Sequence, residues 1–65
     1  MKVQVNRQTR ELPDDATVQT LLIDLGANVG PIAVELNRRV LPRDQYDRDL
    51  CEGDQIEVVT FVGGG

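Results

Sequence analysis

The stretch TVQTLLIDLG, residues 17–26, decides the fold that the sequence predicts. Its apolar residues recur at i, i+3, i+4 and i+7, which is the spacing of one face of a helix. Thr17 is a suitable N-cap, because its hydroxyl accepts from the free N–H groups of the first turn, and Gly26 stands where a left-handed C-cap is required. We therefore predict a helix of about two turns over residues 18–25 that packs one face on a sheet. The residues of that face are Val18, Leu21, Leu22 and Leu25.

On the N-terminal side of the helix, the sequence has the pattern of a β-hairpin. Residues 2–6 (KVQVN) alternate between polar and apolar side chains, as a half-buried strand does. Residues 6–8 are polar and are predicted to form the turn. Residues 9–12 (TREL) are then the short return strand, and Pro13 ends it because proline cannot donate to a sheet.

On the C-terminal side of the helix, three further strands are predicted after a loop. The segment 32–37 (IAVELN) alternates again. After a turn at residues 37–38, residues 40–41 form a short strand that Pro42 ends. A turn at residues 53–54 then precedes the longest strand pattern, which covers residues 55–62.

Charged residues fill the loop predicted over residues 43–49, and one aromatic and one aliphatic residue are expected to hold it on the core. These are Tyr46 and Leu50. We interpret Cys51 as a small, half-buried filler rather than a sulfur relay, because the acidic neighbours Asp49 and Asp54 lower the reactivity of a thiol. The arginines of this region alternate with Asp and Glu, which predicts a mixed, solvated surface rather than a basic patch.

Strands arranged around a single helix predict an α+β fold of two layers, with one helix on a mixed sheet of four to five strands. The helix provides the crossover that a parallel pair of strands requires. The last strand is therefore expected to lie parallel to the first, between the two halves of the sheet. This is the β-grasp (ubiquitin-like) arrangement. The predicted domain covers residues 1–62, and residues 63–65 form a flexible glycine tail.

Length and charge limit the partners. At 65 residues the chain suffices for one domain with a thin core. The net charge of -4 disfavours nucleic acid and favours protein partners with a basic docking face. The apolar runs are too short for a membrane span or a signal peptide, so we predict no membrane partner and expect the protein in the cytoplasm. The single cysteine cannot form an internal disulfide and fits a reducing compartment.

Catalysis by the chain itself is disfavoured. The sequence has no histidine, so nucleophile–base pairs of the usual kind and Cys/His metal sites are missing. A core of this size leaves little room for a cleft of several hundred cubic ångströms. No P-loop or other phosphate-binding glycine motif is present. We therefore predict no intrinsic catalytic residue, bound cofactor or metal, and expect the chain to act through a surface or through its end.

The last predicted strand places two large apolar residues on its open face. The even-numbered residues of Ile56–Thr60 are expected to face the helix, which leaves Val59 and Phe61 on the opposite face beside the tail. An exposed apolar patch on a small domain usually marks a docking site. We therefore interpret Val59, Phe61 and the adjacent Val62 as partner-docking residues. The alternative is that Phe61 folds over the sheet edge as additional core.

Three glycines, Gly63, Gly64 and Gly65, close the sequence. Without side chains, such a segment can enter a narrow channel, and three extended residues reach about 10 Å. A carboxylate at Gly65 is ionised at neutral pH and is a poor electrophile. A partner that binds ATP and magnesium must therefore activate it, for instance as an acyl-adenylate. The alternatives for this segment are a frayed end and a cloning remnant.

Several stretches together resemble the ThiS family, the sulfur carriers of thiamine biosynthesis, over nearly the whole chain. The most specific stretch is VELNRRVLPRDQY, residues 34–46, in which a strand, an asparagine turn, two aliphatic residues and Pro-Arg precede an aromatic residue. Many relatives have two terminal glycines where this chain has three, which leaves open whether Gly65 or Gly64 is the reactive end. The other matching stretches are VQVN (3–6), TVQTLL (17–22), GDQIEVV (53–59) and FVGGG (61–65).

The resemblance implies a cycle in which the carboxylate of Gly65 is the working group. An E1-like adenylyltransferase of the ThiF type would use ATP and Mg to form the acyl-adenylate, and a persulfide derived from a cysteine desulfurase would convert it to a thiocarboxylate. A thiazole synthase of the ThiG type would then take the sulfur into the thiazole ring of thiamine. The chain would be a protein cosubstrate rather than an enzyme. Our own hypothesis, from the open face of the last strand, is that Val59 and Phe61 form the docking face that both enzymes share.

Two other functions remain open from the sequence. The same fold and tail fit a sulfur-donating subunit of another pathway, such as molybdopterin or a sulfur-bearing secondary metabolite. They also fit a ubiquitin-like module that binds its partners non-covalently, or a modifier whose tail forms isopeptides with lysines. A non-covalent module would tolerate loss of the glycines, whereas a carrier would not.

Overall fold

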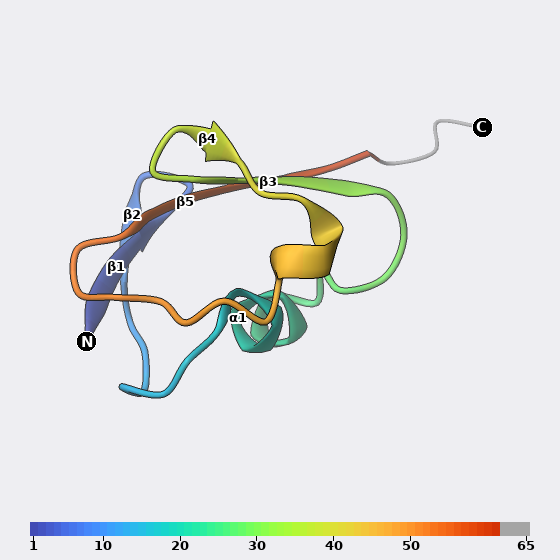
Figure 1. The fold of residues 1–65 in the computed structure, drawn as a ribbon. Helices are drawn as coiled ribbons and strands as arrows, with labels where there is room; N and C mark the ends of the chain where they lie inside the picture. The colour runs from blue at the N-terminus through green and yellow to red at the C-terminus, as the bar shows by residue number, and fades with distance from the viewer. Residues whose placement is uncertain (62–65) are drawn as a thin grey trace.

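The predicted helix is present with the predicted bounds. The structure, a computed structural model, describes residues 1–61, and α1 spans Val18–Leu25 within them (Figure 1). The Thr17 hydroxyl accepts a hydrogen bond from the Thr20 N–H at 3.2 Å, and the Thr20 hydroxyl accepts one from the Thr17 N–H at 2.9 Å. Gly26 has a φ of +70°, and its N–H donates to two carbonyls of the last turn. The residues that the sequence indicates as caps therefore form hydrogen bonds with the free backbone groups at both ends of the helix.

Five strands form one mixed sheet. They are β1 (Lys2–Val5), β2 (Gln8–Glu11), β3 (Ile32–Leu36), β4 (Arg39–Val40) and β5 (Gln55–Thr60). Their order across the sheet is β2-β1-β5-β3-β4, with β1 parallel to β5 and all other neighbours antiparallel. The first and last strands are thus parallel and adjacent inside the sheet, which confirms the predicted β-grasp fold.

The strand bounds differ slightly from the predicted ones. The first hairpin turn is one residue shorter than predicted, whereas the second lies at residues 37–38 as predicted. Each turn consists of two residues, Asn6-Arg7 and Asn37-Arg38, all at positive φ, as in the type I′ turns that suit a twisted hairpin. β2 and β4 each begin one residue earlier than predicted. β5 ends at Thr60, and Val62, which is predicted to continue this strand, lies outside the described residues.

α1 packs against one face of the sheet, and the apolar side chains between the two layers form the core (Figure 1). Tyr46 and Leu50 are buried, as predicted, and hold the charged loop with its short 3₁₀ helix η1 (Arg43–Gln45) on this core. The largest fully buried side chains are Val3, Val18, Leu21, Leu22, Val34 and Ile56.

The charged loop also closes the N-terminus of the helix. The N–H groups of Val18 and Gln19 donate to the carbonyls of Arg48 and Tyr46, at 3.1 and 2.8 Å. These N–H groups have no acceptor within the helix, because they belong to its first turn. The loop therefore stabilises the helix by accepting from donors that would otherwise need water.

Cys51 differs from its prediction, because it is exposed rather than half-buried. The neighbouring Leu50 takes the core position, and the chain then turns at Gly53, whose φ is +83°. The Cys51 N–H donates to the Asp54 carboxylate at 2.8 Å, and the Asp54 N–H donates to the Cys51 carbonyl at 3.0 Å. The interpretation of Cys51 as a filler is therefore wrong.

Candidate docking face and glycine segment

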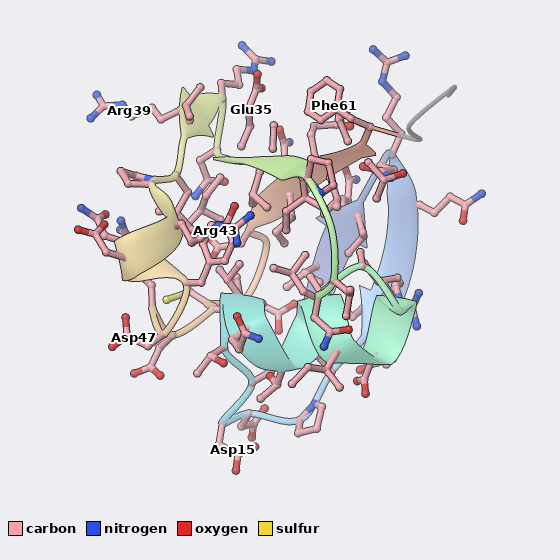
Figure 2. All side chains as sticks on the ribbon, turned by 90° about the vertical axis from the view of Figure 1, so that its right-hand side faces the viewer. Asp15, Glu35, Arg39, Arg43, Asp47 and Phe61 are labelled. Carbon is pink, nitrogen blue, oxygen red and sulfur yellow. The ribbon has the colours of Figure 1, made fainter. Side chains whose placement is uncertain are left out.

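The two faces of β5 differ in exposure, as the alternation predicts. Ile56 is buried and Val58 packs, partly buried, against the core. Val59 and Phe61 are 51% and 56% exposed. Figure 2 shows Phe61 on the side of the molecule away from α1. Phe61 is therefore not additional core, and its use in docking stays a prediction.

The end of β5 lies beyond the core. Thr60, which the alternation assigns to the helix face, is exposed, and its cross-strand partner Ile32 is only half-buried. The Phe61 N–H still donates to the Pro31 carbonyl at 3.1 Å. The sheet therefore holds the backbone as far as Phe61, two positions before Gly63, where the predicted tail begins.

The remaining predicted site residues, Val62, Gly63, Gly64 and Gly65, lie outside the described residues. The docking role of Val62 and the sulfur-carrying role of the glycine segment therefore stay predictions. So does the division of the chain into a domain over residues 1–62 and a flexible tail over residues 63–65.

Two asparagine side chains hold β5 from either side. The Val58 N–H donates to Oδ1 of Asn6 at 2.7 Å, and Nδ2 of Asn6 donates to the Val58 carbonyl at 3.2 Å. At the other end of the strand, the Gln55 N–H donates to Oδ1 of Asn37 at 2.9 Å. β1 ends before it reaches Val58, so the Asn6 amide takes the place of the missing backbone partner. The sequence identifies the Asn6 region only as a turn and gives no signal for this contact.

Replacing Asn6 with glycine is expected to loosen the end of β5. Glycine adopts the φ of +50° found at this position without strain, so the change removes two hydrogen bonds and little else. We expect a loss of about 1–3 kcal/mol in the free energy of unfolding, measured in urea, and faster amide exchange at Val58. Arg7→Gly, in the same turn, is the control and should not destabilise the chain. Unchanged exchange at Val58 in Asn6→Gly would contradict this role.

The side chains on the face of the sheet away from α1 form a surface that we call the outer face. Together with Arg7 and Arg38 at the two hairpin turns, they line an open depression of about 540 Å³. Figure 2 shows Glu35 on the same side of the molecule as Phe61. The outer-face residues in this depression are Gln4, Ala33, Glu35, Val40, Gln55, Glu57 and Val59.

Glu35 and Glu57 lie directly opposite each other on β3 and β5. Like charges in such a position cost about 0.2–1 kcal/mol of stability. Within residues 1–61, the ion pairs are both made by the Met1 amino nitrogen, with Glu11 at 3.9 Å and Asp14 at 3.2 Å. In this part of the chain, therefore, no lysine or arginine side chain neutralises the two carboxylates by an ion pair.

The described residues are suited to presenting a surface. Among them, no group of three His, Cys, Asp or Glu side chains is arranged as metal ligands are. The helices of this same region are too short and too polar to cross a membrane. The five-stranded sheet presents an exposed apolar patch, Val59 and Phe61, shortly before the glycine segment in the sequence.

Comparison with known proteins assigns the chain to a family. The sequence model of the ThiS family matches residues 3–65. The chain belongs to the ThiS family. It is 38% identical to the sulfur carrier protein ThiS of Bacillus subtilis (strain 168) over 53 residues, which cover 80% of each chain. A crystal structure of the thiamine biosynthesis protein ThiS from Geobacter metallireducens superposes with a TM-score of 0.82 at 33% identity, covering 100% of both chains.

The ThiS resemblance seen in the sequence is thus confirmed, together with its β-grasp fold. A thiazole synthase of Paramagnetospirillum magneticum is also 36% identical to this chain over 100% of its length. The match covers 20% of that enzyme, so the chain spans about a fifth of the length of this relative.

Within this ThiS fold, the structure brings the predicted docking residues Val59 and Phe61 to one face and adds residues that the sequence does not single out. Glu35 and Glu57 are the clearest case. The alternation of each strand places its glutamate opposite the core residues, and this signal is present in the sequence. Their direct opposition depends on the register between β3 and β5, which the sequence does not supply.

Proposed function

We propose that this chain is a sulfur carrier whose working group is the carboxylate of Gly65. The observation that carries the proposal is the match to the ThiS family over residues 3–65, a range that includes the glycine segment. The exposure of Val59 and Phe61 supports it further. An apolar patch shortly before the glycines would give partner enzymes a surface to hold while the tail reaches their active sites.

In the proposed cycle, a carboxylate oxygen of Gly65 attacks the α-phosphorus of ATP, and pyrophosphate leaves. An adenylyltransferase of the ThiF type binds the ATP and Mg²⁺ and catalyses this step. A persulfide derived from a cysteine desulfurase then attacks the acyl carbon, and AMP leaves. A thiol then attacks the sulfur of the donor's cysteine in the resulting acyl disulfide. The S–S bond breaks, the thiocarboxylate is released, and the thiol and the donor's cysteine are left as a disulfide. This chain contributes the reacting carboxylate and the docking face, as a cosubstrate of its partners.

We further propose that a thiazole synthase of the ThiG type consumes the thiocarboxylate. The similarity of the whole chain to a part of the Paramagnetospirillum magneticum thiazole synthase supports a link between the two proteins. Sulfur would pass to the precursor of the thiazole ring of thiamine, and Gly65 would return to its carboxylate form. The similarity to thiazole synthase favours the thiazole precursor as the sulfur acceptor over the precursors of other sulfur-containing products.

Intact-mass measurement of the protein isolated from its own cells tests the proposal. We expect a fraction of molecules whose mass is raised by the replacement of one oxygen with sulfur. Fragmentation should place the change on the last glycine, which would also identify the reactive residue as Gly65 or Gly64. Cells that lack the adenylyltransferase are the control and should contain only the carboxylate form. A protein that never carries sulfur in cells making thiamine would contradict the proposal.

A further inference from the structure

The centre of the outer face combines two carboxylates with two exposed valines. Glu35 lies between Glu57 on one neighbouring strand and Val40 on the other, directly opposite both. Val59 follows Glu57 on the same face of β5. Val40 and Val59 are 73% and 51% exposed, so the acidic centre has an apolar surface on either side.

The two carboxylates are close together and the described residues do not neutralise them by ion pairs. Residues directly opposite in an antiparallel pair have Cα atoms about 4.5–5.5 Å apart, so the two side chains adjoin. Arg7 and Arg38 line the same depression, and they belong to turns whose asparagines bond β5 at Val58 and Gln55, on either side of Glu57. Neither arginine forms an ion pair within residues 1–61.

A side chain that complements this centre needs a positively charged head and an apolar stem. Lysine and arginine have both, because their methylene stems cover apolar surface while the charged end reaches a carboxylate. Arginine fits best, since its planar guanidinium donates to two carboxylates at once. Docking would also exclude water, which strengthens the attraction between the cation and both glutamates.

We propose that Glu35 and Glu57 bind a cationic side chain of thiazole synthase, an arginine or a lysine, whose stem lies against Val40 and Val59. This inference rests on the proposed function. Two observations point to this partner. Val59 joins the acidic centre to Phe61 on one continuous face, so an enzyme seated on Phe61 also covers Glu57. The relative from Paramagnetospirillum magneticum contains a segment like this chain within a thiazole synthase.

The test compares a Glu35→Gln/Glu57→Gln double variant with the original chain, titrated into purified thiazole synthase of the same organism by calorimetry. We expect the Kd to rise by at least about tenfold and to depend less on salt. The variant should meanwhile become more stable, with a Tm higher by roughly 1–5 °C, because the repulsion between the strands is gone. A loss of binding together with a gain in stability cannot come from unfolding.

The matched control is Asp15→Asn/Asp47→Asn, which changes the net charge equally on the opposite side of the molecule (Figure 2). It should bind thiazole synthase as the original chain does. Equal affinity of the original chain and the glutamate variant would overturn the inference while leaving the proposed function intact. Binding that falls equally in the control variant would also overturn it, because net charge alone would then explain the loss. Failure of the original chain to bind thiazole synthase would contradict the proposed function itself.

Discussion

A chain shortened to end at Val62 is expected to fold normally and to lose sulfur loading altogether. The core residues lie between Val3 and Ile56, so the deletion removes no core contact of the described residues. The new carboxylate would stand about 10 Å nearer to the domain than that of Gly65. Because misplacement of a reacting group by 1 Å can cost about 10²-fold in rate, we expect adenylation to fall by at least about 10³-fold. Exchange of pyrophosphate into ATP, with the adenylyltransferase present, measures this step.

A second variant tests separately whether adenylation needs the length of the tail or its lack of side chains. Gly64→Val keeps the reach of Gly65 but adds a branched side chain where the tail would enter a channel. We expect it to lose adenylation almost as fully as the shortened chain does. Circular dichroism and Tm should match the original protein for both variants. If the chain ending at Val62 still supports sulfur incorporation, the proposed function is wrong.

Phe61→Asp is expected to weaken docking strongly while the domain stays folded. Phe61 is 56% exposed, so an aspartate at this position costs little in the free protein. In a complex, the same aspartate would be buried without a partner against an apolar surface. Loss of a central aromatic contact together with this burial predicts a KM for adenylation higher by at least about 100-fold. The kcat at saturation should change less, because the glycine segment is intact.

Ile23→Asp provides the matched control for this prediction. Ile23 is 53% exposed, nearly the same as Phe61, but it lies on α1, whereas Phe61 lies on the side of the molecule away from that helix. The control should keep the original KM even if the helix loses a little stability. Equal effects of the two substitutions would mean that any new charge disturbs the complex, and the docking role of Phe61 would then be withdrawn.

The parts of this fold that the sequence predicts well are those fixed by local chemistry. The bounds of α1 follow from the threonine cap, the apolar spacing and Gly26, all within ten residues. The parallel pairing of the first and last strands follows from the single crossover helix. The exposure of Val59 and Phe61 follows from simple alternation along β5.

The parts that the sequence does not predict depend on contacts between distant segments. The Asn6 side chain bonds Val58, which is 52 residues further along the sequence, and no local sequence pattern predicts this contact. The opposition of Glu35 and Glu57 needs the register of two strands that are joined only through the rest of the chain. Thr60 is exposed because the core ends before it, which alternation alone does not reveal. The sequence therefore identifies the docking strand, whereas its neighbours on the outer face come from the structure.

The pairing of β1 with β5 determines when the sheet can form during synthesis of the chain. During synthesis, residues 2–5 leave the ribosome well before their central neighbour in the sheet, residues 55–60. A two-stranded hairpin alone is at best marginally stable in water, so the sheet closes late. Enzymes that dock on the surface of β5, as we propose, would therefore not bind chains whose translation stops before this strand. The topology therefore lets this surface form only on chains that have been translated past residue 60.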